Sequence, residues 1–150
     1  MLFLIILQLM FFGTLIASCS YAAWCGGWPE RAGATIMVTA TILSVIAAGS
    51  FNPSWKTTEL GIFLVDMLML AALVNLALYS DRFWPIWVTS FHLIAVTTHL
   101  ARLVDHSVAA LAYANVAAFW AYPMMIALAV GTWNHQRRER STRKGNAARY

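Results

Sequence analysis

Residues 91–106 read FHLIAVTTHLARLVDH, a stretch apolar enough to lie in a lipid bilayer although it holds five ionisable side chains. In an α-helix a seven-residue step covers nearly two full turns, so residues at this spacing fall along one stripe. The stretch places three histidines at this spacing: His92, His99 and His106. Leu93 and Leu100 fall on another side and are expected to face lipid. The stretch therefore predicts a membrane helix with one polar face.

The whole chain has the composition of a membrane protein. Of its 150 residues 61% are hydrophobic and only 11% are charged, whereas a soluble domain usually has about a quarter of its residues charged. The net charge of +4 is concentrated in residues 134–150, which hold six Lys or Arg and one Glu. The high pI is therefore a property of the C-terminal tail, and it gives no sign of a nucleic-acid-binding groove.

Five segments of the chain could each cross a membrane, because a spanning helix needs roughly 17–25 mostly apolar residues. The linkers between them contain Gly, Pro, Asn and Ser, which are typical of loops. The sequence predicts an all-α polytopic membrane protein, with a transmembrane bundle at 1–133 and a short basic cytoplasmic tail at 134–150. The five expected helices are about 2–23, 32–48, 60–79, 85–104 and 109–133. A four-helix alternative has the first segment removed or lying in the interface.

The placement of Lys and Arg predicts how the chain is oriented. The basic tail is expected in the cytoplasm. Five spans of the cell (inner) membrane then put the N-terminus on the outer side of that membrane. Amphipathic aromatic side chains prefer the membrane–water interface, and six are expected at the cytoplasmic one: Trp24, Trp28, Tyr79, Trp84, Trp87 and Trp133.

The tail is expected to attract anionic lipid headgroups or an acidic partner, because clustered cations next to a membrane helix favour such contacts. The side chains concerned are Arg137, Arg138, Arg140, Arg143 and Lys144.

The two cysteines, Cys19 and Cys25, do not form a CxxC motif and have no nearby ligands to complete a zinc set, so no metal site is predicted. The stretch Ile16-Ala17-Ser18-Cys19 resembles the lipobox of bacterial lipoproteins, which would make Cys19 a lipidated N-terminus. Residues 1–18 contain no Lys or Arg, and this argues against a cleaved signal peptide. The cysteines are therefore interpreted as small residues near a helix end.

Polar side chains at membrane depth are expected to meet inside the bundle, because each ionisable group there costs about 2.5–3.5 kcal/mol on insertion scales. If the third and fourth helices form an antiparallel hairpin, Asp66 lies level with His99. Arg102 lies about one turn nearer the outer surface. Each helix then brings a polar side chain to one layer: Gln8, Ser44, Asp66, His99 and Asn115. An unpaired buried carboxylate is unfavourable, so Asp66 is expected to contact His99 or Arg102.

Three interpretations of this polar layer remain open. It can be a purely structural set of interhelical contacts. It can be a proton- or ligand-handling site, since a histidine beside a carboxylate can carry a proton; that site would use Asp66, His92, His99 and Arg102. It can also be a haem site with His92, His99 and His106 as candidate ligands, although a homodimer would have to supply the partner histidines.

The sequence contains no Gly-rich phosphate loop, GxSxG or HExxH motif, so it does not indicate an enzyme. Five short helices are also expected to enclose little volume. The leading hypothesis is therefore an accessory or structural subunit of a membrane assembly, whose partners are other membrane subunits or a second copy. No cofactor is predicted. The alternatives are a proton-coupled transporter or channel-like protein, and an electron-transfer protein that binds haem b or a quinone.

Overall fold

The computed structural model describes the backbone of residues 2–50, 55–104 and 110–147, and the side chains of residues 5–48, 60–101 and 119–147. Within these ranges the chain is all-α, and its five helices are α1 (Leu2–Cys25), α2 (Trp28–Ser50), α3 (Trp55–Tyr79), α4 (Trp84–Val104) and α5 (Ala110–Ala147). The predicted helical bundle is confirmed. Three stretches of the described residues are long and apolar enough to cross a membrane: Ile5–Cys25, Trp28–Ala48 and Leu60–Tyr79.

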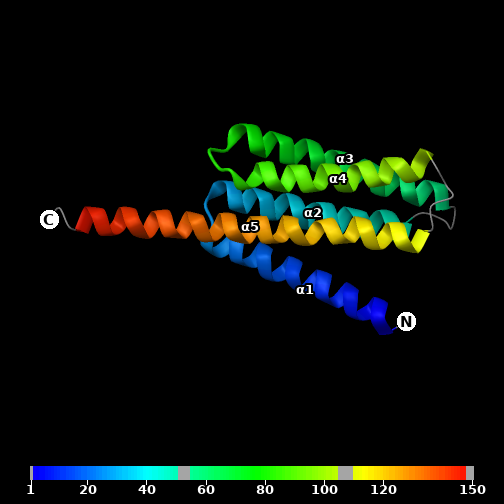
Figure 1. Cartoon of the computed structure of the whole chain (residues 1–150), viewed down its shortest axis with the longest axis horizontal. Helices are drawn as coiled ribbons and strands as arrows, with labels where there is room; N and C mark the ends of the chain where they lie inside the picture. The colour runs from blue at the N-terminus through cyan, green and yellow to red at the C-terminus, as the bar shows by residue number, and fades with distance from the viewer. Residues whose placement is uncertain (1, 51–54, 105–109, 148–150) are drawn as a thin grey trace.

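The helices form a bundle in which each contacts its neighbours along the chain, and α5 returns to contact α1 and α2 (Figure 1). The links at 26–27 and 80–83 are short, so the helix pairs that they join run antiparallel. Both links lie at the end of the bundle from which α5 projects (Figure 1). We call this end the tail end.

The outer surface of the bundle is apolar. Leu64, Leu68 and Leu78 of α3 are all more than 60% exposed, and only 11% of the candidate span in this helix is buried inside the bundle. Leu93 and Leu100 of α4 are also exposed, as expected for lipid-facing side chains. Exposing so much apolar surface to water would be unfavourable, whereas acyl chains can cover it.

The best-packed part of the core lies near the tail end, around Trp84 at the start of α4. The indole ring of Trp84 lies between Gly33 of α2 and Gly131 of α5, and a Cβ atom at either glycine would collide with it. Trp84 therefore differs from the expectation of an aromatic belt, since it is buried inside the bundle. The other five aromatic residues of that group are exposed: Trp24, Trp28, Tyr79, Trp87 and Trp133.

Three helices extend four or more residues beyond an expected bound. α2 begins at Trp28, because Gly27 caps it: the Gly27 N–H donates to Glu30 Oε2 at 2.9 Å, the geometry of a capping box. α3 begins at Trp55, earlier than the hydropathy indicated. α5 continues to Ala147 instead of ending at 133, because Arg, Glu, Gln and Lys are good helix formers even where they are too polar for lipid.

The first helix leaves the bundle along its N-terminal half. Leu15, Cys19 and Ala22 are buried against the other helices, whereas the side chains of residues 5–10 are all exposed. Figure 1 shows this half of α1 angled away from the remaining helices. Cys19, the residue in the lipobox-like stretch, lies within the packed part of the helix.

Candidate functional site

Asp66 of α3 and His99 of α4 are in contact, with His99 Nε2 3.1 Å from Asp66 Oδ2. The two residues lie about 20 Å from the tail end along their helices, so the hairpin brings them level as expected. Their side chains are mostly buried, with 16% of Asp66 and 18% of His99 exposed. The predicted contact between Asp66 and His99 is therefore present. The side chain of Arg102, the other candidate partner, lies outside the described residues.

His92 contacts the same aspartate through the backbone, with His92 Nε2 2.9 Å from the Asp66 carbonyl oxygen. A carbonyl oxygen only accepts hydrogen bonds, so Nε2 of His92 carries the proton. In a helix carbonyls point toward the C-terminus and side chains tilt toward the N-terminus. Asp66 thus meets His92 with its carbonyl and meets His99, two turns farther along α4, with its carboxylate. His106, the third histidine of the stripe, lies outside the described residues.

These residues form part of the wall of a pocket of about 930 Å³, to which all five helices contribute. The pocket occupies the polar layer expected from the sequence, because four members of that layer line it: Gln8, Ser44, Asp66 and His99. Asn115, the fifth, lies on α5 with its side chain outside the described residues. The expectation that five short helices enclose little volume is therefore wrong. It failed because the divergence of α1 leaves this space unfilled.

Most of the pocket wall is apolar. The part contributed by α1 includes Leu7, Phe11 and Phe12, at or next to the diverging half of that helix. The Phe11 ring meets the Tyr122 ring of α5 edge to face, with ring centroids 6.4 Å apart. The pocket thus combines a largely hydrophobic wall with the paired Asp66 and His99 side chains, beside a helix that stands away from its neighbours.

A second polar cluster, which sequence reasoning missed, lies at the tail end. Glu30 of α2 is fully buried. Its Oε2 accepts a hydrogen bond from the Gly27 N–H at 2.9 Å, and its Oε1 accepts one from the Trp84 indole N–H at 3.0 Å. Because both oxygens are hydrogen-bonded, burial of this carboxyl group is far less unfavourable than it would be without partners. The available sequence signal was Gly27 followed three residues later by Glu30, the spacing of a capping box.

Two further hydrogen bonds attach α5 to this end of the bundle. Arg82, in the link between α3 and α4, lies with Nη2 3.1 Å from His135 Nδ1. A guanidinium group only donates, so Nδ1 of His135 is the acceptor. The Tyr21 hydroxyl of α1 donates to Gln136 Oε1 at 3.1 Å. These contacts join α1, α5 and the α3–α4 link. We interpret the cluster as a set of structural contacts that hold the helices together at the tail end.

The projecting part of α5 carries five basic residues of the tail, and all side chains of residues 137–147 are exposed: the five are Arg137, Arg138, Arg140, Arg143 and Lys144. Arg137 lies over the Trp133 ring, 4.6 Å from its centroid. Glu139 lies 3.7 Å from both His135 and Arg143. Such exposed ion pairs contribute little to stability. The tail is therefore a charged helix that stands clear of the bundle, and its binding to lipid headgroups or an acidic partner stays a prediction.

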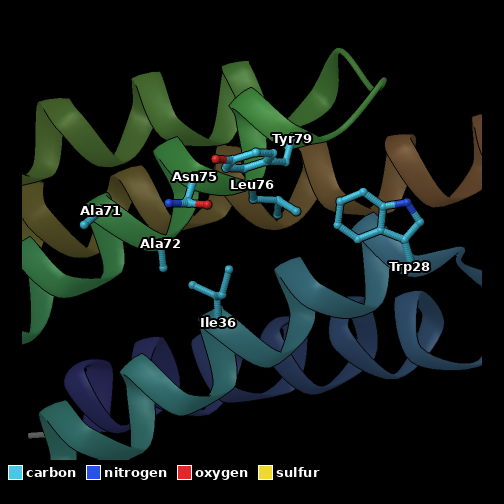
Figure 2. A pocket seen from close by; sticks show the side chains of 7 residues that line it. All are labelled: Trp28, Ile36, Ala71, Ala72, Asn75, Leu76 and Tyr79. Atoms are coloured by element: carbon cyan, nitrogen blue, oxygen red, sulfur yellow. The ribbon is translucent and has the colours of Figure 1, made fainter.

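A smaller groove of about 500 Å³ lies between α2 and α3 near the tail end. Figure 2 shows Trp28 and Ile36 of α2 facing Leu76 of α3, with Asn75 and Tyr79 beside them. No Asp, Glu, His, Lys or Arg lines this groove. It therefore lacks the acid–base groups of the larger pocket, although the exposed amide of Asn75 can still form hydrogen bonds.

The histidines of this pocket are also the candidate haem ligands. Among the described residues, no three His, Cys, Asp or Glu side chains lie close enough together to hold a metal ion. Nε2 of both His92 and His99 faces Asp66, so ligation of iron through either Nε2 atom would require these contacts to break.

Comparisons of the chain with protein-family models, curated protein sequences and solved structures found no match.

Proposed function

We propose that this chain is a five-span membrane protein that binds a lipophilic small molecule between its helices, with Asp66 and His99 contacting the polar group of that molecule. The observation that carries the proposal is the pocket of about 930 Å³ with this pair in its wall. Small-molecule sites typically measure about 300–1,000 Å³, are mostly apolar, and hold a few polar groups that fix the ligand's orientation. The pocket has each of these properties.

The lengths of the last two helices support five spans. α4 has 21 residues and α5 has 38, and about 20 residues cross the hydrocarbon core. α4 is not among the three candidate spans, and we attribute this to His92 and His99, which lower its hydropathy although both line the pocket inside the bundle. The basic tail then favours a cytoplasmic C-terminus and an N-terminus outside the cell membrane.

The same pair would also suit a proton-coupled transporter or channel, because a histidine beside a carboxylate can transfer a proton. We favour ligand binding because the pocket wall is mostly apolar and lies beside the diverging half of α1. These features suit a molecule that enters from lipid better than an aqueous path for ions.

A second candidate function, an accessory subunit of a membrane assembly, is favoured by the groove between α2 and α3. Asn75 is exposed there, and amide side chains between transmembrane helices commonly form interhelical hydrogen bonds. A helix of another subunit, or of a second copy, would fit this role. Co-purification of a partner that Asn75→Leu abolishes and Asp66→Asn preserves would support this second function.

The test of ligand binding is to purify the protein in mild detergent and identify the extracted small molecules by mass spectrometry. We expect a lipophilic molecule whose retention falls at least about tenfold in Asp66→Asn and in His99→Gln, because each change removes a hydrogen bond to a charged group, worth about 1.5–3 kcal/mol. Ser90→Ala is the matched control, since Ser90 is exposed on α4 and its hydroxyl donates to the Ile86 carbonyl of its own helix. Equal retention by all four proteins would reject the proposal.

A further inference from the structure

We infer that the pocket selects neutral lipids whose head groups carry carbonyl or hydroxyl oxygens, and that it disfavours lipids with a permanent charge. This inference rests on the proposed function, because it names the class of ligand for the same pocket. Three features of the pocket carry it: hydrogen-bonding groups without partners, balanced charges among the described side chains, and a wall that includes the diverging helix α1.

The hydrogen-bonding groups come from helices other than those of the ion pair. Gln8 of α1 and Ser44 of α2 both line the pocket. Within the described part of the chain, neither side chain has a hydrogen-bond partner. An amide and a hydroxyl each offer a donor and an acceptor, and leaving such groups unpaired in an apolar environment is unfavourable. A ligand oxygen at this level can supply the missing partner.

The charges of the described side chains in the pocket wall are balanced. Its ionisable side chains are Asp66, His92 and His99, and no Lys or Arg lines it among the residues whose side chains are described. The Asp66–His99 pair has no net charge, whether both groups are ionised or both are neutral. A sulfonate or a quaternary ammonium would therefore lack an unpaired counter-ion among the described side chains of the wall. Because unpaired charges are costly at low dielectric, a neutral head group fits this wall better.

The pocket is partly open, and part of its wall comes from α1, the helix that leaves the bundle. Leu7, Phe11 and Phe12 line the pocket from α1, and Figure 1 shows the N-terminal half of this helix angled away from the other helices. A lipid can therefore enter from the bilayer beside α1, with its chain against these apolar side chains. Its head group then reaches the level of Asp66.

The experiment uses three photoreactive probes that share one alkyl chain and end in a hydroxyl, a sulfonate or a quaternary ammonium group. The full-length protein is reconstituted in phosphatidylcholine nanodiscs, and labelled peptides are quantified by mass spectrometry. We expect the hydroxyl probe to label pocket-lining peptides at least about tenfold more than either charged probe, equivalent to about 1.4 kcal/mol. Asp66→Asn should raise sulfonate labelling relative to hydroxyl labelling, because the variant has no acidic group to balance a protonated His99, which can then pair with the anion.

A filled-pocket variant separates failure of this inference from failure of the proposed function. Ala48→Trp adds a large side chain at a pocket-lining position on α2, and its folding is checked by thermal unfolding. A charged probe could label the wild type as strongly as the hydroxyl probe does, or more strongly, with Ala48→Trp abolishing that labelling. This result would overturn the preference for neutral lipids and leave ligand binding intact. An unchanged labelling ratio in Asp66→Asn would overturn the charge argument. If each of the three probes labelled the wild type and Ala48→Trp equally, the proposed function itself would be overturned.

Discussion

At the scale of single residues, the tail end of the bundle depends on how closely two glycines approach one indole ring. The Trp84 ring is fixed by its hydrogen bond to Glu30 and cannot move aside easily. We therefore expect Gly33→Ala and Gly131→Ala each to lower the free energy of unfolding by about 1–3 kcal/mol, as overpacking does in other cores. Unfolding in mild detergent, followed by tryptophan fluorescence, measures the effect.

The matched control for these two changes is Gly13→Ala, since nothing lies within 4 Å of a Cβ atom at Gly13. Replacing a glycine by alanine inside a helix normally stabilises it, by up to about 1 kcal/mol. Gly13→Ala should therefore be neutral or stabilising. If all three variants lost stability equally, the close approach to Trp84 would not be the cause.

The Asp66–His99 pair provides a second test at this scale, through a double-mutant cycle with Asp66→Asn and His99→Gln. Each single change should destabilise the protein, because it leaves the other member of a mostly buried pair without its partner. The double variant should lose less than the two single losses together, by about 0.5–2 kcal/mol. Unfolding in detergent gives the four free energies, and strict additivity would show that the two side chains are not coupled.

These residues differ in how far the sequence could predict them. The distance of Asp66 and of His99 from the short link between their helices follows from counting residues. Because these two distances match, their contact was predictable. Glu30 was not, because it follows two glycines and a proline and its burial depends on Trp84, far along the chain. Local patterns give the depth of a residue in a helix, but they do not show which distant side chain will cover it.

At the scale of whole helices, α5 shows that hydropathy locates the end of a membrane span but not the end of a helix. The sequence turns polar after Trp133, and the expected helix ended there. The residues that follow still favour helix, and Glu139 and Arg143 are spaced four apart, which adds weak support. The bound at 133 thus marks where lipid contact is expected to end, whereas the helix itself continues to Ala147.

The length of this helix is testable with spin labels at Asn134 and Gly145, both exposed, in a background where Cys19 and Cys25 are replaced by alanine. A continuous helix places the two backbones about 16 Å apart. A fully extended chain would place them about 36 Å apart. We expect one narrow distance distribution near the shorter value in pulsed electron paramagnetic resonance. A broad distribution centred well beyond it would show that the tail is not helical in solution.

At the scale of the whole molecule, the two ends of the bundle differ in how closely they are packed. The tail end is filled by Trp84 and its neighbours, and the opposite end contains the pocket beside α1. The sequence predicted the helix order and the polar layer, since both depend on distances along the chain. It did not predict the pocket volume, because this depends on the angle at which α1 crosses the other helices. This division places the proposed binding site at the end of the bundle opposite the closely packed core around Trp84.

The orientation of the molecule in the membrane is the prediction that distinguishes five spans from four. Residues 1–18 carry no Lys or Arg, whereas residues 134–150 hold six, so translocation of the N-terminus and retention of the tail are both favoured. An epitope placed before Met1 should react with a membrane-impermeant reagent on intact cells, and an epitope after Tyr150 should react only after lysis. A reporter after Arg82 should be active in the cytoplasm, because the link at 80–83 lies at the tail end (Figure 1). Protection of both terminal epitopes would favour four spans with α1 at the interface, and a reactive C-terminal epitope on intact cells would reverse the orientation.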